Sequence, residues 1–222
     1  MQAQEKDAAQ KECVQTAWRN FKAHFHNPKV QENIRNSKEE QYQSEFLIDL
    51  FVKVLGYTKN PNPDFNLTTE LKNVKDSKKA DGAILLKDAQ EPKKEPYVAA
   101  VIELKGTQTT DLGKIETQAF GYKNNQPKCT YVLTSNFEKI RLYVENAIEH
   151  IEFNLFKLSE KEFQVLYLLL AYPNLKNHLP KRIKEESQNQ EDVITKKLYQ
   201  DYSTFKEQLF ENLVAKNPNY EP

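Results

Sequence analysis

Three charged side chains stand at the ends of two apolar segments of this sequence. Asp81 lies near the start of "KADGAILL" (residues 79–86), and Glu103 and Lys105 close "VAAVIELKG" (98–106). Both segments have the composition of buried strands, where an unpaired charge is expensive. Two carboxylates and an amine in such places therefore indicate a site with a chemical role.

The chemistry that suits these residue types is hydrolysis of a phosphodiester with a divalent metal ion. Mg²⁺ in such sites is held by one or two carboxylates together with water and substrate oxygens, and it activates the attacking water. Asp81 and Glu103 occupy corresponding places on neighbouring predicted strands, so their side chains can converge on one ion. Residues i and i+2 of a strand project from the same face. Glu103 can therefore bind the metal while Lys105 contacts the attacking water or the phosphate.

Simpler explanations exist for the same residues. Asp81 could be a turn residue, and Glu103 and Lys105 could form a strand-end ion pair. His24 and His26 have no third ligand near them in sequence, which favours surface histidines over a metal site. The clustering of two carboxylates favours the metal site for Asp81 and Glu103, because a purely structural scaffold gains nothing from it.

Both helices and strands are predicted around these residues. Apolar residues at helical spacing predict a helix over residues 39–57, ended by Gly56, and further helices over residues 10–26 and 112–123. Strands are predicted at residues 65–72, 79–86, 97–106, 129–135 and 139–145, with a further one within 148–155. The order helix, three strands, helix, two strands predicts one α/β layer.

Composition limits the classes of protein that remain. The 222 residues include 32 basic and 32 acidic side chains, so the net charge is +0 and contacts with nucleic-acid phosphates must come from a local patch or from another domain. The sequence has neither a long apolar segment nor a signal peptide, which predicts a cytoplasmic protein without a membrane partner. Cys13 and Cys129 belong to no CxxC pair, which argues against a disulfide framework.

The character of the sequence changes after residue 158. Ser159, followed three residues later by Glu162, has the pattern of a capping box at the start of a helix. A polar stretch then leads into another segment with apolar residues at helical spacing. We therefore predict an α/β domain over residues 1–158 and a helical connector over residues 159–222, in which "NPNY" (217–220) is interpreted as a tail.

The ordered set of charged residues resembles the PD-(D/E)XK nuclease superfamily, in which an Asp opens one strand and (D/E)-x-K closes the next. Ala80-Asp81 stands where the family has Pro-Asp, and Glu103 and Lys105 match the second element. Glu45, on the helix before the sheet, corresponds to an acidic residue that many members add to the metal site.

A further match lies on the next helix, where Gln118 and Tyr122 fit the Q-x-x-x-Y element. The resemblance covers residues from about 40 to 145. It implies a restriction-endonuclease-like core with a helical C-terminal extension. It also implies a metal site of Glu45, Asp81 and Glu103, and catalytic roles for Asp81, Glu103, Lys105 and Gln118.

More narrowly, the sequence resembles the N-terminal endonuclease region of type IIG restriction-modification enzymes, single chains that fuse nuclease, methyltransferase and target-recognition domains. That resemblance implies a type II site-specific deoxyribonuclease that uses Mg²⁺, with Mn²⁺ able to substitute, and acts on double-stranded DNA. The methyltransferase and target-recognition domains would belong to the same full-length chain.

Several alternatives stay open at this point. One is the nuclease domain of a RecB-like enzyme or of a type I restriction motor subunit. Another is a catalytically silent PD-(D/E)XK scaffold that binds DNA or a protein partner. Within the site itself, Glu70 on a preceding strand competes with Glu45 as the additional acidic ligand.

Overall fold

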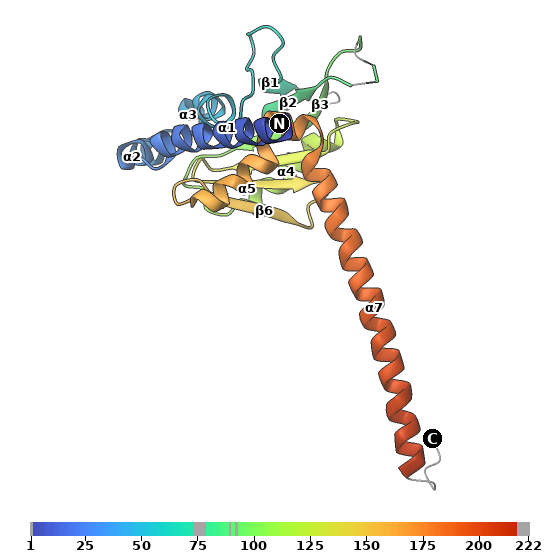
Figure 1. Cartoon of the computed structure of the whole chain (residues 1–222). Coiled ribbons are helices and arrows are strands. Elements are labelled where there is room, and N and C mark those ends of the chain that lie inside the picture. The colour runs from blue at the N-terminus through green and yellow to red at the C-terminus, as the bar shows by residue number, and fades with distance from the viewer. Residues whose placement is uncertain (1, 73–78, 89, 92, 217–222) are drawn as a thin grey trace. The chain divides into compact units, whose positions relative to one another are not determined.

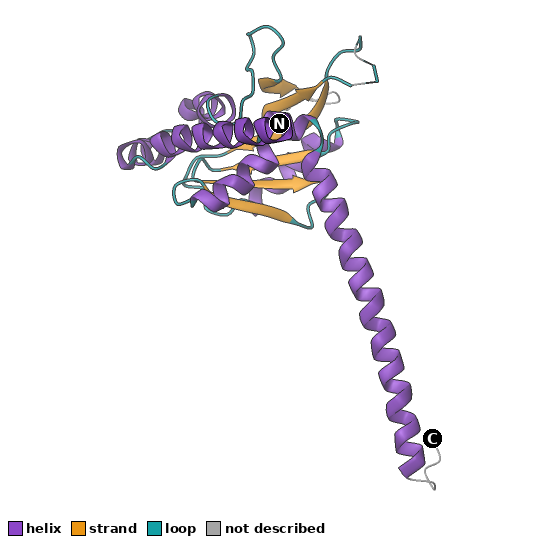
Figure 2. Cartoon of the chain, viewed as in Figure 1, coloured by secondary structure: helices purple, strands orange, loops and turns teal. Residues whose placement is uncertain are grey.

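A computed structural model describes residues 2–72, 79–88, 90–91 and 93–216, and it has a mixed α/β fold built on a six-stranded sheet (Figures 1 and 2). Residues 217–220, interpreted above as a tail, lie outside the described part. The elements in chain order are α1 (Gln2–Phe25), α2 (Pro28–Asn36), α3 (Glu39–Phe46), the π-helical segment η1 (Leu47–Val52), β1 (Leu67–Lys72), β2 (Lys79–Leu86), β3 (Tyr97–Leu104), α4 (Gly113–Asn124), β4 (Tyr131–Ser135), β5 (Lys139–Val144), β6 (His150–Asn154), α5 (Glu160–Leu170), α6 (Tyr172–Lys176) and α7 (Leu179–Lys216).

The strands lie in the sheet in the order in which they occur along the chain. Neighbouring strands are antiparallel except for β3 and β4, which are parallel. A parallel pair needs a crossover connection, and α4 provides it. The predicted succession of helices and strands is therefore confirmed, including a sixth strand within residues 148–155.

Two cores of unequal size lie on the two faces of the sheet. On one face, α1, α3, η1 and α5 bury a large cluster against the strands, with Phe21, Phe46 and Phe163 fully buried in it. On the other face, α4 packs Ala119 and Tyr122 into a smaller cluster that also includes Val101, Val132 and Tyr143. Both faces of β3 and β4 are thus covered, which explains why these strands are almost wholly buried.

The helix predicted over residues 39–57 differs from a regular α-helix. The segment begins as α3, but at Leu47 it widens into η1, and Lys53 N–H bonds to the carbonyl of Ile48, five residues earlier. Gly56 then ends the segment at a φ of +78°, a left-handed conformation that glycine adopts without strain. Gly56 is thus confirmed as the end of the helical segment. The π-helical turn of η1 could not be predicted from the spacing of the apolar residues.

The chain divides into two compact units, residues 1–180 and 181–222. In the first unit, Ser159 and Glu162 form the predicted capping box at the start of α5. Phe163 and Leu166 of α5 are fully buried in the large core. The domain boundary predicted after residue 158 stays a prediction, which a truncation described below can test.

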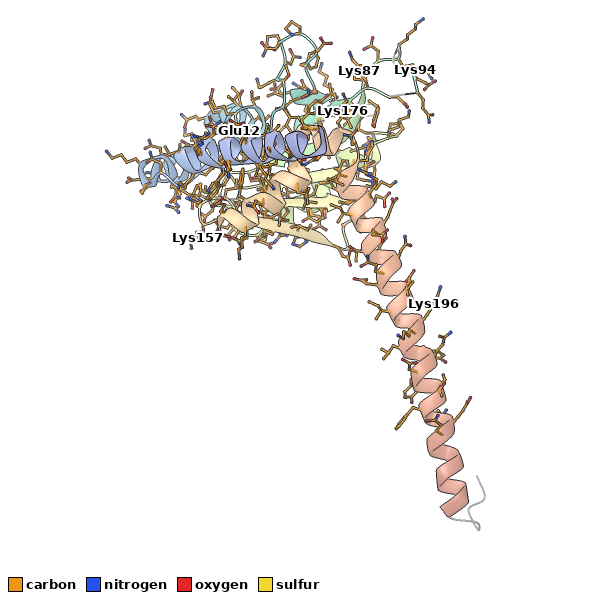
Figure 3. The ribbon with its side chains drawn as sticks, viewed as in Figure 1. Glu12, Lys87, Lys94, Lys157, Lys176 and Lys196 are labelled. Atoms are coloured by element: carbon orange, nitrogen blue, oxygen red, sulfur yellow. The ribbon has the colours of Figure 1, made fainter. Side chains whose placement is uncertain are left out.

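The second unit consists of the greater part of α7. The polar stretch 181–193, expected to precede a helix, is itself helical. Lys196 projects from the middle of this helix (Figure 3). No helix within the described residues is both long enough and apolar enough to cross a membrane. Among the α7 side chains that the structure describes, the large apolar ones that are exposed are Ile183, Val193, Ile194, Leu198, Tyr199, Tyr202 and Phe205.

Candidate active site

The pairing of β2 with β3 sets Asp81 opposite Glu103. Gly82 pairs with Ile102 in this antiparallel ladder, and one further step in the same register brings Asp81 to Glu103. The Leu104 N–H donates to Asp81 Oδ2 at 2.8 Å, so the carboxylate of Asp81 is attached directly to β3. Asp81 lies within β2, and its interpretation as a turn residue is therefore wrong.

Glu103 is almost completely buried, with 1% of its surface exposed. Its Oε1 accepts hydrogen bonds from Lys105 Nζ at 3.0 Å and from Gln118 Nε2 at 2.7 Å. Gln118 Nε2 also lies 3.1 Å from the hydroxyl of Tyr122, which holds the amide in place. The ion pair between Glu103 and Lys105 is thus present, but it leaves Oε2 buried without a partner among the described residues.

The first residue of α3 adds a third carboxylate that sequence reasoning missed. Glu39 Oε1 lies 3.4 Å from Lys105 Nζ, and Glu39 Oε2 accepts from the Gly106 N–H at 3.1 Å. Gln43, one turn later, donates to Glu39 and hydrogen-bonds to Asp81. The N-terminal end of α3 is therefore part of the cluster.

The two acids considered for this position from sequence lie elsewhere. Glu45 is exposed, and its charge acts on Tyr42 and Lys53. Glu70 is exposed on β1 and pairs with Lys79 at 2.8 Å. The structure thus brings together Asp81, Glu103, Lys105 and Gln118, and it places Glu39 beside them in place of Glu45.

Burial controls the electrostatics of the cluster. Burial, and next the charge of Asp81, raise the pKa of Glu103 from its ordinary 4.5 to about 7. Burial also raises the pKa of Asp81, although the bond from Leu104 N–H opposes the change. For Lys105, burial acts to lower the pKa, but the hydrogen bond to Glu103 and the nearby carboxylates outweigh it and raise the pKa. The cluster therefore has an excess of acidic groups around one ammonium.

This arrangement fits a divalent cation with oxygen ligands. Within the described residues, no group of three or more His, Cys, Asp or Glu side chains is positioned to hold a metal ion by itself. Mg²⁺ commonly uses only one or two carboxylates and keeps several waters. The unpartnered Oε2 of Glu103 and the partly solvated Asp81 are oxygen donors of that kind, so the residues present fit such an ion.

Comparison with known proteins gives a match to one family model. No curated protein and no solved structure matches the chain. The family model described as "MmeI, N-terminal domain" matches residues 20–198, a range that includes the whole sheet and every residue of the cluster. The chain therefore belongs to the family of the MmeI N-terminal domain, a restriction-enzyme N-terminal region.

Proposed function

We propose that this chain is the metal-dependent endonuclease region of a restriction-modification enzyme of the type IIG kind, with a PD-(D/E)XK active site formed by Asp81, Glu103, Lys105 and Gln118. The observation that carries the proposal is the buried Oε2 of Glu103, which has no hydrogen-bond partner in the part of the chain that the structure describes and lies beside Asp81. A buried carboxylate oxygen without a donor is costly in a purely structural role. Membership of a restriction-enzyme family supports the same reading.

Each residue of the cluster has a distinct role in this proposal. Asp81 and Glu103 would hold Mg²⁺, for which Mn²⁺ can substitute, through their carboxylate oxygens. The bound ion supplies an activated water and positive charge at the phosphate. Lys105 adds a fixed positive charge that stabilises the negative charge developing on the phosphate. Gln118, held by Tyr122, fixes the orientation of the Glu103 carboxylate.

The proposed substrate is double-stranded DNA, selected by other parts of the full-length protein. The net charge of +0 gives this chain no general attraction to phosphate. Three lysines near the β2–β3 connection are already paired with acids: Lys87 with Asp64, Lys94 with Glu91, and Lys128 with Asp88 (Lys87 and Lys94 are labelled in Figure 3). We therefore assign sequence recognition to methyltransferase and target-recognition domains of the same full-length chain.

The test compares Glu103→Ala with Lys105→Ala. Removing Glu103 takes an oxygen ligand from the ion, so Mn²⁺ binding measured by calorimetry and plasmid cleavage by the full-length protein should both fall. Removing Lys105 should leave Mn²⁺ affinity similar or slightly higher, because a nearby positive charge is lost. Cleavage should still fall by roughly 10²-fold, the scale for losing one preorganised electrostatic group.

A matched pair of variants on α3 separates the cluster from its surroundings. Glu39→Gln should weaken Mn²⁺ binding, because the Glu39 carboxylate lies against Lys105 and the end of β3. Glu45→Gln, a change of the same charge on the same helix, should have no effect. Full cleavage by Lys105→Ala would refute the assignment. A wild-type protein that binds neither Mn²⁺ nor Mg²⁺ would instead identify a catalytically silent scaffold.

A further inference from the structure

Thr134 lies next to Glu103 on the neighbouring strand. Glu103 of β3 and Thr134 of β4 are Cα partners in the parallel ladder, about 4.8 Å apart, the usual distance between strands. Two residues earlier, Val101 and Val132 are also partners, and both pack in the small core under α4. Because side chains alternate along a strand, Glu103 and Thr134 share this α4-facing side of the sheet.

Both side chains have a buried polar atom without a partner. Thr134 is fully buried, and its Oγ1, like Glu103 Oε2, makes no hydrogen bond within the described residues. The two atoms are chemically complementary, since an ionised carboxylate only accepts hydrogen bonds and a hydroxyl can donate one. Native proteins leave few such atoms, and an unseen water or ion is a common reason where they occur.

The neighbouring hydroxyl, on Ser135, shows that burial in β4 does not by itself leave a hydroxyl without a partner. Ser135 is also fully buried, but its Oγ donates to the Lys139 carbonyl at 2.7 Å and accepts from the Phe137 N–H at 3.0 Å. Ser135 thus stabilises the turn between β4 and β5. Thr134 makes no such bond in the turn within the described residues, and its side chain lies on the same side of the sheet as Glu103.

We propose that Thr134 is a positioning residue of the metal site, whose hydroxyl donates to Glu103 Oε2 through one water. Glu103 Oε1 is already fixed by Lys105 and Gln118. A donor from β4 fixes the other oxygen, so that the carboxylate presents it to the ion in one orientation. This inference rests on the proposed function, since it assigns a role toward the metal held by Asp81 and Glu103.

The hydroxyl can be removed with little change in shape. Thr134→Val should weaken Mn²⁺ binding about 10-fold in calorimetric titration, the scale for losing a residue that orients a metal ligand. Thr134→Ser keeps the hydroxyl and should stay within about threefold of the wild type. Val132→Ala, on the same face of the same strand, is the packing control: it should lower the melting temperature in metal-free buffer without changing Mn²⁺ affinity.

The outcomes distinguish this inference from the metal site itself. If Thr134→Val does not fold, Thr134→Ala and Thr134→Ser replace it as a pair, since they differ only in the hydroxyl. Equal Mn²⁺ affinity with and without the hydroxyl overturns the role of Thr134, provided that Glu103→Gln has lost affinity. If Glu103→Gln binds Mn²⁺ as the wild type does, the metal site is wrong, and the role of Thr134 is wrong with it.

Discussion

Glu103 is held in a place where its ionised form destabilises the folded protein. Its pKa is raised to about 7 in the fold, against an ordinary value of 4.5, first by burial and then by Asp81. A carboxyl group with a raised pKa contributes stability that is fully present below pH 4.5 and is lost as the pH rises to about 7. The free energy of unfolding should therefore decrease across that interval and then level off.

Glu103→Gln should remove this dependence, because the amide stays neutral. In metal-free buffer at pH 8 the variant should be more stable than the wild type by on the order of 3 kcal/mol, and at pH 5 the two should be similar. Urea denaturation at the two pH values measures the difference, with the exposed Glu45→Gln as the control that should show none. A stability difference that is the same at pH 5 and pH 8 would contradict the raised pKa.

At the scale of elements, a second polar cluster connects α1 to the α3–η1 segment. Asp49 of η1 is buried and accepts from Lys53 Nζ at 2.7 Å and from the Tyr42 hydroxyl at 3.3 Å. His24 Nε2 of α1 lies 3.1 Å from Asp49 Oδ2 and 2.9 Å from the Tyr42 hydroxyl. Burial lowers the pKa of His24, so His24 is neutral at neutral pH and contacts Asp49 through a hydrogen bond.

Asp49→Ala should therefore destabilise the fold by roughly 3 kcal/mol, because it removes the buried carboxylate that Tyr42, His24 and Lys53 share. Lys53→Ala removes only the exposed partner and should cost about 1 kcal/mol or less. Both variants should keep the wild-type Mn²⁺ affinity, since the cluster around Asp49 has no part in the proposed site. A cost for Asp49→Ala no larger than that for Lys53→Ala would show that Asp49 does not hold α1 in place.

The strands were predictable from sequence because their signals are local. The predicted bounds of β2 agree with the structure, since an apolar run between polar segments defines both ends. Glu103 and Lys105 were predictable together because strand periodicity places them on one face, whereas Gln118 was implied by the resemblance of its helix to the Q-x-x-x-Y element. It was harder to predict that Glu39, and not Glu45, lies beside Asp81 and Glu103. That depends on which face of α3 meets the end of β3.

One sequence signal pointed to Glu39. It lies seven residues, about two turns, before the buried Phe46, and therefore on the same side of the helix. Glu45 is adjacent to Phe46 and points about 100° away. The position of Thr134 beside Glu103 could not be predicted in this way, because the β3–β4 register is determined by packing under α4. His24 was expected on the surface, and its contact with Asp49 likewise depends on how two distant helices pack.

At the scale of the whole molecule, the large core ends before α7. The buried members of both cores lie between Ala17 and Leu175, and the first compact unit ends at Pro180. By contrast, the described large apolar side chains beyond Pro180 are exposed, among them Leu198 and Phe205. Stability and the proposed metal site should therefore both belong to residues 1–180.

Two truncations test this division against the boundary predicted after residue 158. A chain cut after Pro180 should unfold in one cooperative thermal transition within a few degrees of the 222-residue chain. It should also gain stability with Mn²⁺ by mass action, by about 2.7 kcal/mol at a hundredfold excess over the dissociation constant. A chain cut after Leu158 loses Phe163, Leu166 and Leu170 from the core and should lose its cooperative transition, because each buried side chain removed costs roughly 2 to 5 kcal/mol. If instead the chain cut after Leu158 unfolds as cooperatively as the longer one, α5 belongs to a separate connector. Its buried side chains would then not be needed for the stability of the α/β domain.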